Sequence, residues 1–127
     1  MRKTIFALLI AVSLPAFGEW KLTEILVDGS HLYYDPSTIE RKGNLVRVSE
    51  LSDLPALNQM GRLSYRTQHE YDCSAPRSRV IRSESYPTHM ATGAALDVDD
   101  HSSGDAEWVE FHPGSRSDKM SKLVCAK

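Results

Sequence analysis

Strict alternation of two kinds of side chain marks one stretch of the chain, Ser64 to Cys73. One set of alternate positions consists of Tyr65, Thr67, His69, Tyr71 and Cys73. The positions between them carry charged or amide side chains, namely Arg66, Gln68, Glu70 and Asp72. A period of two is the side-chain repeat of a β-strand. The pattern predicts a strand whose first set faces a core and whose second set faces water.

Five further segments have the apolar content and the flanking turn residues that are typical of strands. They are residues 19–27, 31–35, 45–51, 77–86 and 107–112. Asp28-Gly29 between the first two is a hairpin signal. Asp35-Pro36 is expected to end the second strand, because proline cannot donate a hydrogen bond to a ladder. Residues 52–61 and 87–107 have no clean period and are predicted to be irregular.

The C-terminal residues have the period of a helix. Met120, Leu123 and Val124 repeat at i, i+3 and i+4 and form one apolar stripe. Ser115, followed three residues later by an aspartate, fits a capping box and is expected to begin the helix. At about 100° per residue, Cys125 lies roughly 140° from Met120, at the margin of the stripe.

Six short strands followed by one helix predict an α+β domain. The expected architecture is a roughly six-stranded antiparallel sheet with the C-terminal helix packed on one face. The other face is expected to meet water, as in antiparallel sheets that are covered on one side only.

The first 18 residues have the composition of a secretory signal peptide. Basic residues at 2 and 3 precede an apolar run at 5–14, and small residues precede a cleavage site after Gly18. The run is shorter than the roughly 20 residues of a membrane-spanning helix, so no membrane span is expected. A buried N-terminal helix is the alternative. Export to the periplasm or outer cell surface is therefore predicted, with residues 19–127 as one mature domain.

The net charge of the chain disfavours two kinds of binding partner. Without residues 1–18 the chain has 13 basic and 17 acidic residues, a formal charge of about −4, which favours neither nucleic acid nor an anionic membrane.

Two cysteines in an exported chain favour one disulfide, Cys73 to Cys125, over a metal site; two free thiols are the alternative. The bridge would hold the C-terminal helix against strand 64–73. Its loop of about 50 residues contributes roughly 4 kcal/mol in the chain-entropy model.

An ordered set of residues spans essentially the whole mature chain. It comprises Trp20, residues 34–39 and 43–48, Ser64, residues 70–73, Tyr86, Met90-x-x-Gly93, Trp108, residues 113–115 and residues 124–125. This set resembles the bacterial surface-adhesin protein E family. The resemblance implies an exported Gram-negative protein with a six-stranded sheet, a disulfide-tethered C-terminal helix, and binding to host proteins such as vitronectin and laminin. The chain departs from the family pattern at Ser49-Glu50, where a bulky residue is common, and no cysteine for a lipid anchor follows Gly18.

Other chemistry has weaker support. Acidic residues in the stretch 97–107 offer oxygen ligands for Ca²⁺, but the EF-hand positions for glycine and glutamate hold Ser102 and Trp108, so a solvated loop is favoured. The histidines lack zinc-binding spacing, and His69 is expected to be a hydrogen-bonded, partly buried side chain beside Tyr71. No Gly-x-Ser-x-Gly elbow is present. No catalytic residue, cofactor site or metal ligand is therefore assigned.

A candidate binding surface combines arginines with a tyrosine on neighbouring predicted strands: Arg66, Arg77, Arg79, Arg82 and Tyr86. Such groups can stack on or bind polyanions such as matrix glycosaminoglycans. The favoured alternative is a solvated face with cross-strand ion pairs to Glu70, Asp72 and Glu84.

The leading hypothesis for function is a non-enzymatic exported binding module for host matrix or serum proteins, using the wet sheet face and loop 87–107. A periplasmic structural or assembly protein without a host ligand is the alternative, and a small hydrolase or metal-binding protein is the third. The sequence leaves the ligand and the oligomeric state open, although an uncovered sheet edge would permit self-association.

Overall fold

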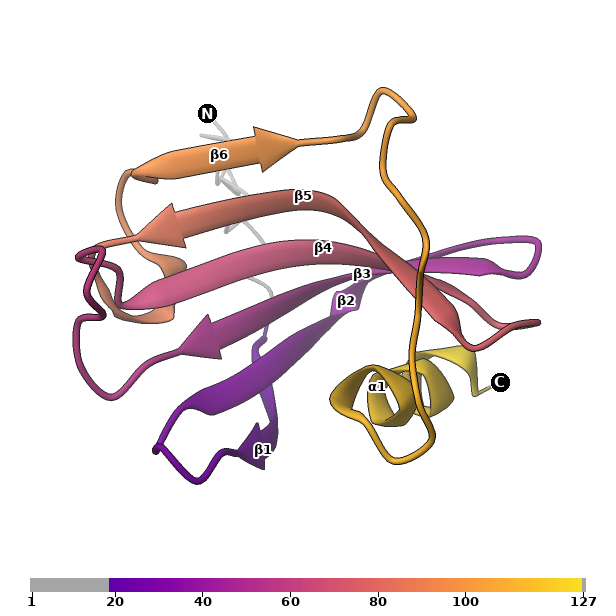
Figure 1. Ribbon diagram of the computed structural model, residues 1–127, viewed down its shortest axis with the longest axis horizontal. Coiled ribbons are helices and arrows are strands. Elements are labelled where there is room, and N and C mark those ends of the chain that lie inside the picture. Colours follow the sequence, from indigo (N-terminus) through magenta and orange to yellow (C-terminus); the bar gives the residue numbers. More distant parts are fainter. Residues whose placement is uncertain (1–18, 127) are drawn as a thin grey trace, which may run out of the picture.

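The computed structural model describes residues 19–126, and its main feature is an antiparallel sheet with one helix across one face (Figure 1). Five strands run side by side in chain order: β1 (Lys21–Ile25), β2 (His31–Lys42), β3 (Leu45–Asp53), β4 (Ser64–Asp72) and β5 (Arg77–Tyr86). Two short strands, β6 (Asp97–Asp100) and β7 (Val109–Glu110), pair with different parts of β5 and share the sixth position. A short 3-10 turn, η1 (His89–Ala91), and the helix α1 (Arg116–Cys125) complete the elements. The predicted α+β fold is confirmed.

Strand β4, which the alternation predicted, lies inside the sheet between β3 and β5. It pairs with β3 without interruption from Asp72 opposite Leu45 to Ser64 opposite Asp53. Its other edge pairs with β5. Within residues 19–126, no helix has the length and hydropathy needed to cross a membrane. The expected signal peptide, residues 1–18, lies outside the described residues.

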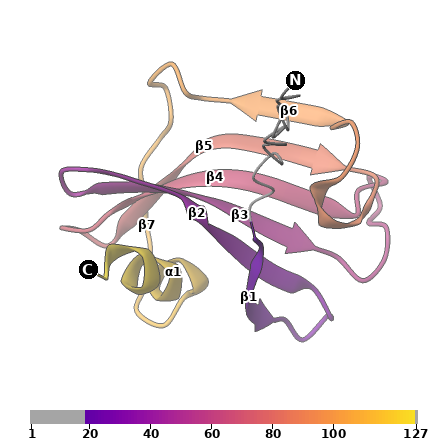
Figure 2. The same ribbon diagram turned by 180° about the vertical axis from the view of Figure 1, so that it is seen from behind.

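The core lies between α1 and the sheet. Val46 and Val48 of β3 and Tyr71 of β4 are buried against Met120 and Val124 of the helix. Tyr71 belongs to the alternating set that was predicted to face a core. Figure 2, the view from behind, shows α1 and β1 at the same lower side of the molecule. The helix therefore covers one face of the sheet, beside its β1 edge.

The helix begins and ends close to where the sequence predicts. The Ser115 hydroxyl accepts a hydrogen bond from the backbone N–H of Asp118 at 3.2 Å. The Asp118 carboxylate in turn accepts from the N–H of Gly114, one residue before the cap. The last helical residue, Cys125, is disulfide-bonded to Cys73, which directly follows β4. The predicted bridge is confirmed.

Strand β2 is longer than predicted, because Asp35-Pro36 bends the strand without ending it. The pairing of β2 with β3 shifts register between Asp35 and Glu40, so Pro36 sits where no ladder bond is needed. The carboxylate of Asp35 accepts hydrogen bonds from the backbone N–H and the hydroxyl of Ser37. The turn residues thus form a local bulge inside a twelve-residue strand.

The predicted sixth strand is present as β7 but is shorter than expected, and β6 was missed. Only Val109 and Glu110 of the expected segment 107–112 pair with β5. The longer partner is β6, which lies in the stretch predicted to be irregular. All four β6 residues are exposed, so this strand lacks the apolar alternation by which strands are recognised.

Candidate functional site

The register of β4 and β5 brings the five predicted binding residues to one face of the sheet. Residues of β4 at 64, 66, 68, 70 and 72 share a face, because the side-chain period of a strand is two. Their partners in β5 are, in the same order, Tyr86, Glu84, Arg82, Arg79 and Arg77. Residues directly opposite each other in a ladder point to the same side. We call this surface, which contains Arg66, Arg77, Arg79, Arg82 and Tyr86, the arginine face.

A β-bulge makes this grouping possible. Arg79 and Arg82 are three residues apart and would point to opposite faces of a regular strand. His69 pairs with Val80, whereas the preceding Gln68 pairs with Arg82, so Ile81 is an extra residue in β5. The bulge returns Arg82 to the face that carries Arg79. No feature of the sequence pattern located it.

Glu70 holds two of the guanidinium groups in place. Its Oε2 lies 2.6 Å from Nε of Arg47, and its Oε1 lies 2.8 Å from Nε of Arg79. Burial raises the pKa of the Glu70 carboxyl, but the hydrogen bonds from the two arginines outweigh burial and hold the pKa below its usual range. Glu70 and Asp72 are buried, so the prediction that this whole face meets water is wrong at both. Long arginine side chains cover their carboxylates.

Trp108 packs on the same face. Glu110 of β7 pairs with Arg77. Trp108 is two residues before Glu110 and therefore lies on the same side of the sheet, the arginine face. The guanidinium carbons of Arg77 and Arg79 lie 4.5 Å and 4.2 Å from the centroid of the Trp108 ring. Arg77 also forms an ion pair with Asp72 at 2.9 Å. Stacking and ion pairing together fix the direction of both guanidinium groups.

Two hollows lie along the arginine face. The larger, of about 680 Å³, extends from the tip of the β2–β3 hairpin to Glu70 and Arg79. The smaller, of about 280 Å³, is lined by Ser49, Arg66, Gln68, Arg82 and Glu84. Glu84 accepts hydrogen bonds from Arg82 and from the hydroxyl of Tyr86. Burial and the hydrogen bond to Glu84 raise the pKa of Tyr86 to about 12, so the phenol remains a donor at physiological pH.

The acidic stretch 97–107 is engaged in ion pairs. Asp97 pairs with Arg62, and Asp100 pairs with Arg82 of the arginine face. Asp99 and Asp105 both lie close to His101, at 3.1 and 3.2 Å. Among the described residues, no group of three or more potential ligands converges on a point where a metal ion would fit.

A polar cluster under α1 was only partly predicted. His69 lies beside Tyr71 and is partly buried, as expected, and its Nδ1 lies 2.6 Å from Oε2 of Glu50. The Tyr71 hydroxyl donates to the same oxygen at 2.7 Å, and Arg116 of the helix lies 3.7 Å from Oε1. Burial raises the pKa of Glu50, but the contacts of His69 and Tyr71 and the charge of Arg116 outweigh burial and lower it. Glu50, the departure from the family pattern, is thus a buried anion with its partners in place.

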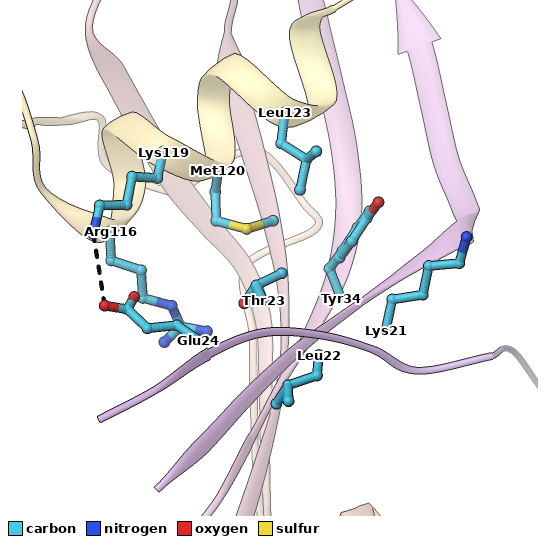
Figure 3. A pocket seen from close by; sticks show the side chains of 9 residues that line it. All are labelled: Lys21, Leu22, Thr23, Glu24, Tyr34, Arg116, Lys119, Met120 and Leu123. Atoms are coloured by element: carbon cyan, nitrogen blue, oxygen red, sulfur yellow. Dashed lines mark ion pairs between the residues drawn. The ribbon is translucent and has the colours of Figure 1, made fainter. Parts of the chain in front are cut away.

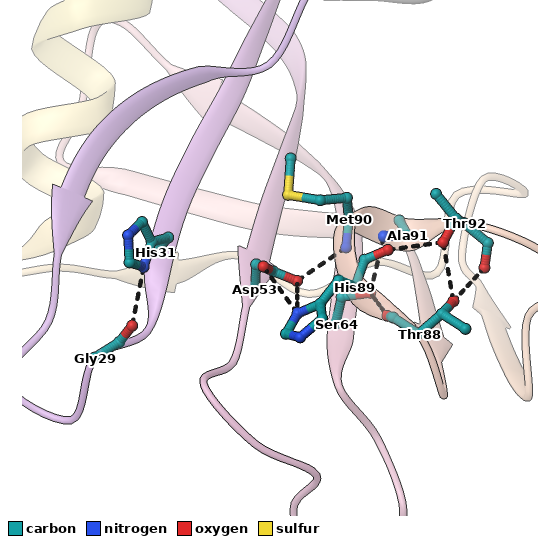
Figure 4. Close-up of polar contacts among 9 residues, drawn as sticks. All are labelled: Gly29, His31, Asp53, Ser64, Thr88, His89, Met90, Ala91 and Thr92. Atoms are coloured by element: carbon teal, nitrogen blue, oxygen red, sulfur yellow. Dashed lines mark hydrogen bonds and ion pairs between the residues drawn. The ribbon is translucent and has the colours of Figure 1, made fainter.

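A second polar cluster holds the loop that contains η1 (Figure 4). Asp53 accepts a hydrogen bond from the backbone N–H of Met90 at 2.9 Å and lies 3.0 Å from Nδ1 of His89. The Ser64 hydroxyl accepts from the N–H of Ala91 at 2.8 Å. Met90 and Ala91 have φ angles of 59° and 52°, in the left-handed region that side chains other than glycine rarely adopt. The loop is thus clamped to β3 and β4 in a strained conformation.

These features define a class of domain in which a disulfide holds a C-terminal helix to one face of an antiparallel sheet. Solved structures of Haemophilus influenzae protein E have a similar fold. One has a TM-score of 0.59 at 11% identity and covers 82% of this chain and 84% of that chain. Another, from a non-typeable strain, has a TM-score of 0.56 at 12% identity, and the match covers 87% of this chain and 79% of that chain. A third, crystal form II, has a TM-score of 0.56 at 13% identity, and the match covers 74% of this chain and 79% of that chain.

The family follows from the sequence of this chain. The family model for surface-adhesin protein E matches residues 20–126. No curated protein matches the chain. The protein belongs to the surface-adhesin protein E family.

Proposed function

We propose that this protein is a non-enzymatic binding module displayed at the bacterial surface, with host extracellular-matrix or serum proteins as partners. Membership of a surface-adhesin family supports this function. The single observation that carries it is the arginine face, where Arg66, Arg77, Arg79 and Arg82 share one side of a rigid sheet. We further propose that this face is the recognition surface.

The chemistry of the arginine face suits an acidic segment of a partner protein. Side chains of Arg77 and Arg82 are each 42% exposed although both take part in ion pairs, so part of each guanidinium group stays available. Guanidinium groups bind carboxylates through two parallel hydrogen bonds. Asp72 and Trp108 already fix the direction of Arg77, and Glu84 and Asp100 fix that of Arg82, so little side-chain freedom is lost when a partner binds.

The test is saturable binding of the purified protein to immobilised vitronectin and laminin. We expect the double variant Arg66→Gln/Arg77→Gln to bind at least tenfold more weakly, and binding of the unmodified protein to weaken as salt is raised. The matched control is Lys119→Gln/Lys122→Gln, which also removes two positive charges, from exposed positions on α1. Absence of saturable binding, or equal losses in the control, would refute the proposal.

Location separates this proposal from a periplasmic structural or assembly role. Protease added to intact cells should digest a surface-displayed protein and leave a periplasmic one whole. Protection of the chain on intact cells, with digestion after the outer membrane is opened, would favour the periplasmic alternative. For the third alternative, a small hydrolase or metal-binding protein, no group of three or more potential ligands within residues 19–126 is placed to hold a metal ion.

A further inference from the structure

A groove separates α1 from the edge strand β1, on the face of the sheet opposite the arginine face (Figure 3). Its volume is about 380 Å³, within the range of roughly 300–1,000 Å³ that is usual for small-molecule sites. Its walls come from the helix on one side and from β1 and β2 on the other. The function proposed above does not use this groove.

The middle of the groove is lined by apolar side chains. Met120 and Leu123 point from α1 toward the ring of Tyr34 on β2. Met120 is buried, whereas Leu123 is 45% exposed. The side chain of Leu22 points away from α1, on the other side of β1. Apolar surface that is left open beside a concave site gains free energy when a ligand covers it.

Positive charge lies at both ends of this apolar lining. Figure 3 shows Lys21 at one end and Arg116 with Lys119 at the other. Two of these cations already have a carboxylate partner, since Arg116 lies 3.7 Å from Glu50 and Lys119 lies near Glu24. Lys119 lies 3.6 Å from Glu24, and within residues 19–126 no ion pair involves Lys21. An anionic group at the Lys21 end of the groove would therefore find a cation without a carboxylate partner.

An apolar channel with cations at its mouths is complementary to a molecule that has one hydrocarbon chain and one negative charge. We propose that the β1–α1 groove binds a free medium-chain fatty acid. The acyl chain lies against Met120, Leu123 and Tyr34, and the carboxylate pairs with Lys21. A purely inorganic anion would leave the apolar lining uncovered, and an uncharged hydrocarbon would leave Lys21 without a partner.

The test measures the affinity of the purified chain 19–127, with its disulfide intact, for octanoate, decanoate and dodecanoate below their micelle concentrations. Each methylene group buried should tighten binding about fourfold until the groove is full. Methyl dodecanoate, which has the same chain without the charge, should bind at least tenfold more weakly than dodecanoate. Affinity that is independent of chain length, or equal for the acid and its methyl ester, would overturn the proposal.

Two variants locate the site. Leu123→Gln removes apolar lining from a half-exposed helical position, and Lys21→Gln removes the proposed charge partner. We expect each to weaken dodecanoate binding at least fivefold, and Lys21→Gln also to narrow the difference between acid and ester. The controls are Leu57→Gln and Lys42→Gln, exposed changes of the same chemistry outside the groove.

An independent readout does not depend on the stability of these variants. The methyl resonance of Met120, followed by nuclear magnetic resonance in the unmodified protein, should shift in proportion to the bound fraction of dodecanoate. If this resonance stays fixed while dodecanoate binds, or if the control variants lose as much affinity as the groove variants, the ligand binds elsewhere and the proposal fails.

Discussion

Removal of the Cys73–Cys125 disulfide should destabilise the domain by about 4 kcal/mol. The perturbation is the double variant Cys73→Ser/Cys125→Ser. The bridge joins residues 52 positions apart, and a cross-link of that span restricts the unfolded chain by about 4 kcal/mol in the chain-entropy model. Domains of this size are commonly stable by only about 5–15 kcal/mol. A single covalent bond therefore supplies a large part of the stability of the fold.

The helix has little stability of its own without the bridge. It has ten residues, and isolated helices shorter than about 12–15 residues are marginal in water. Met120 and Val124 remain to dock it against the sheet. We therefore expect the variant to fold, with α1 protected less strongly from hydrogen exchange than strands β3 and β4.

The assay is urea unfolding followed by the fluorescence of Trp20 and Trp108, with the oxidised protein and the double-serine variant compared side by side. The slope of the transition should steepen in the variant, because its unfolded chain exposes more surface. Met120→Ala in the oxidised protein is the control: it should cost about 2–5 kcal/mol through lost packing while the slope stays unchanged. A loss below about 1 kcal/mol in the double variant would refute the reasoning.

Two further predictions concern Glu50 and the strained loop. The folded-state pKa of Glu50 lies below its ordinary value of 4.5, so its charge stabilises the fold above about pH 4.5, and this contribution is lost as the pH falls. The stability gap between the unmodified protein and Glu50→Gln should therefore narrow from pH 7 to pH 3 in urea titrations; a constant gap would contradict this. Ala91→Gly should raise the stability by about 0.5–1 kcal/mol, because glycine tolerates the φ of 52°. Gly43→Ala, at a φ of 60° with open space around it, should lower stability by a similar amount, and a thermal melt that shows no opposite shifts would argue against strain at Ala91.

Strand β4 could be predicted from the sequence because its two faces differ in chemistry along its whole length. The same reasoning failed for β6, whose residues are all exposed, since a strand with two wet faces has no apolar period. Alternation shows which face of the sheet a side chain lies on, but it does not show whether other side chains cover that side chain. Glu70 was assigned to the correct face, but its burial depends on Arg47, which lies 23 positions earlier in the chain.

The candidate site could likewise be predicted from the sequence only in part. Arg77, Arg79 and Arg82 could be chosen from the sequence as a cluster, but their common face depends on the bulge at Ile81. A bulge is set by the pairing of two strands, and the local sequence of one strand does not locate it. The groove beside α1 was not anticipated at all, because its walls come from β1, β2 and the helix, which meet only in the folded chain.

The position of the disulfide also has a mechanical consequence. The bridge joins Cys73 directly to Cys125, so a pulling force passes through the disulfide and not through the chain between them. The bypassed stretch includes β5, β6, β7 and most of α1. When tension is applied between residues 19 and 126, that stretch cannot lengthen while the bond is intact. At about 3.5 Å per extended residue, the chain can be drawn out to about 190 Å instead of about 370 Å. Under a steady pull, β5 would stay within a covalently closed unit, and with it most of the arginine face.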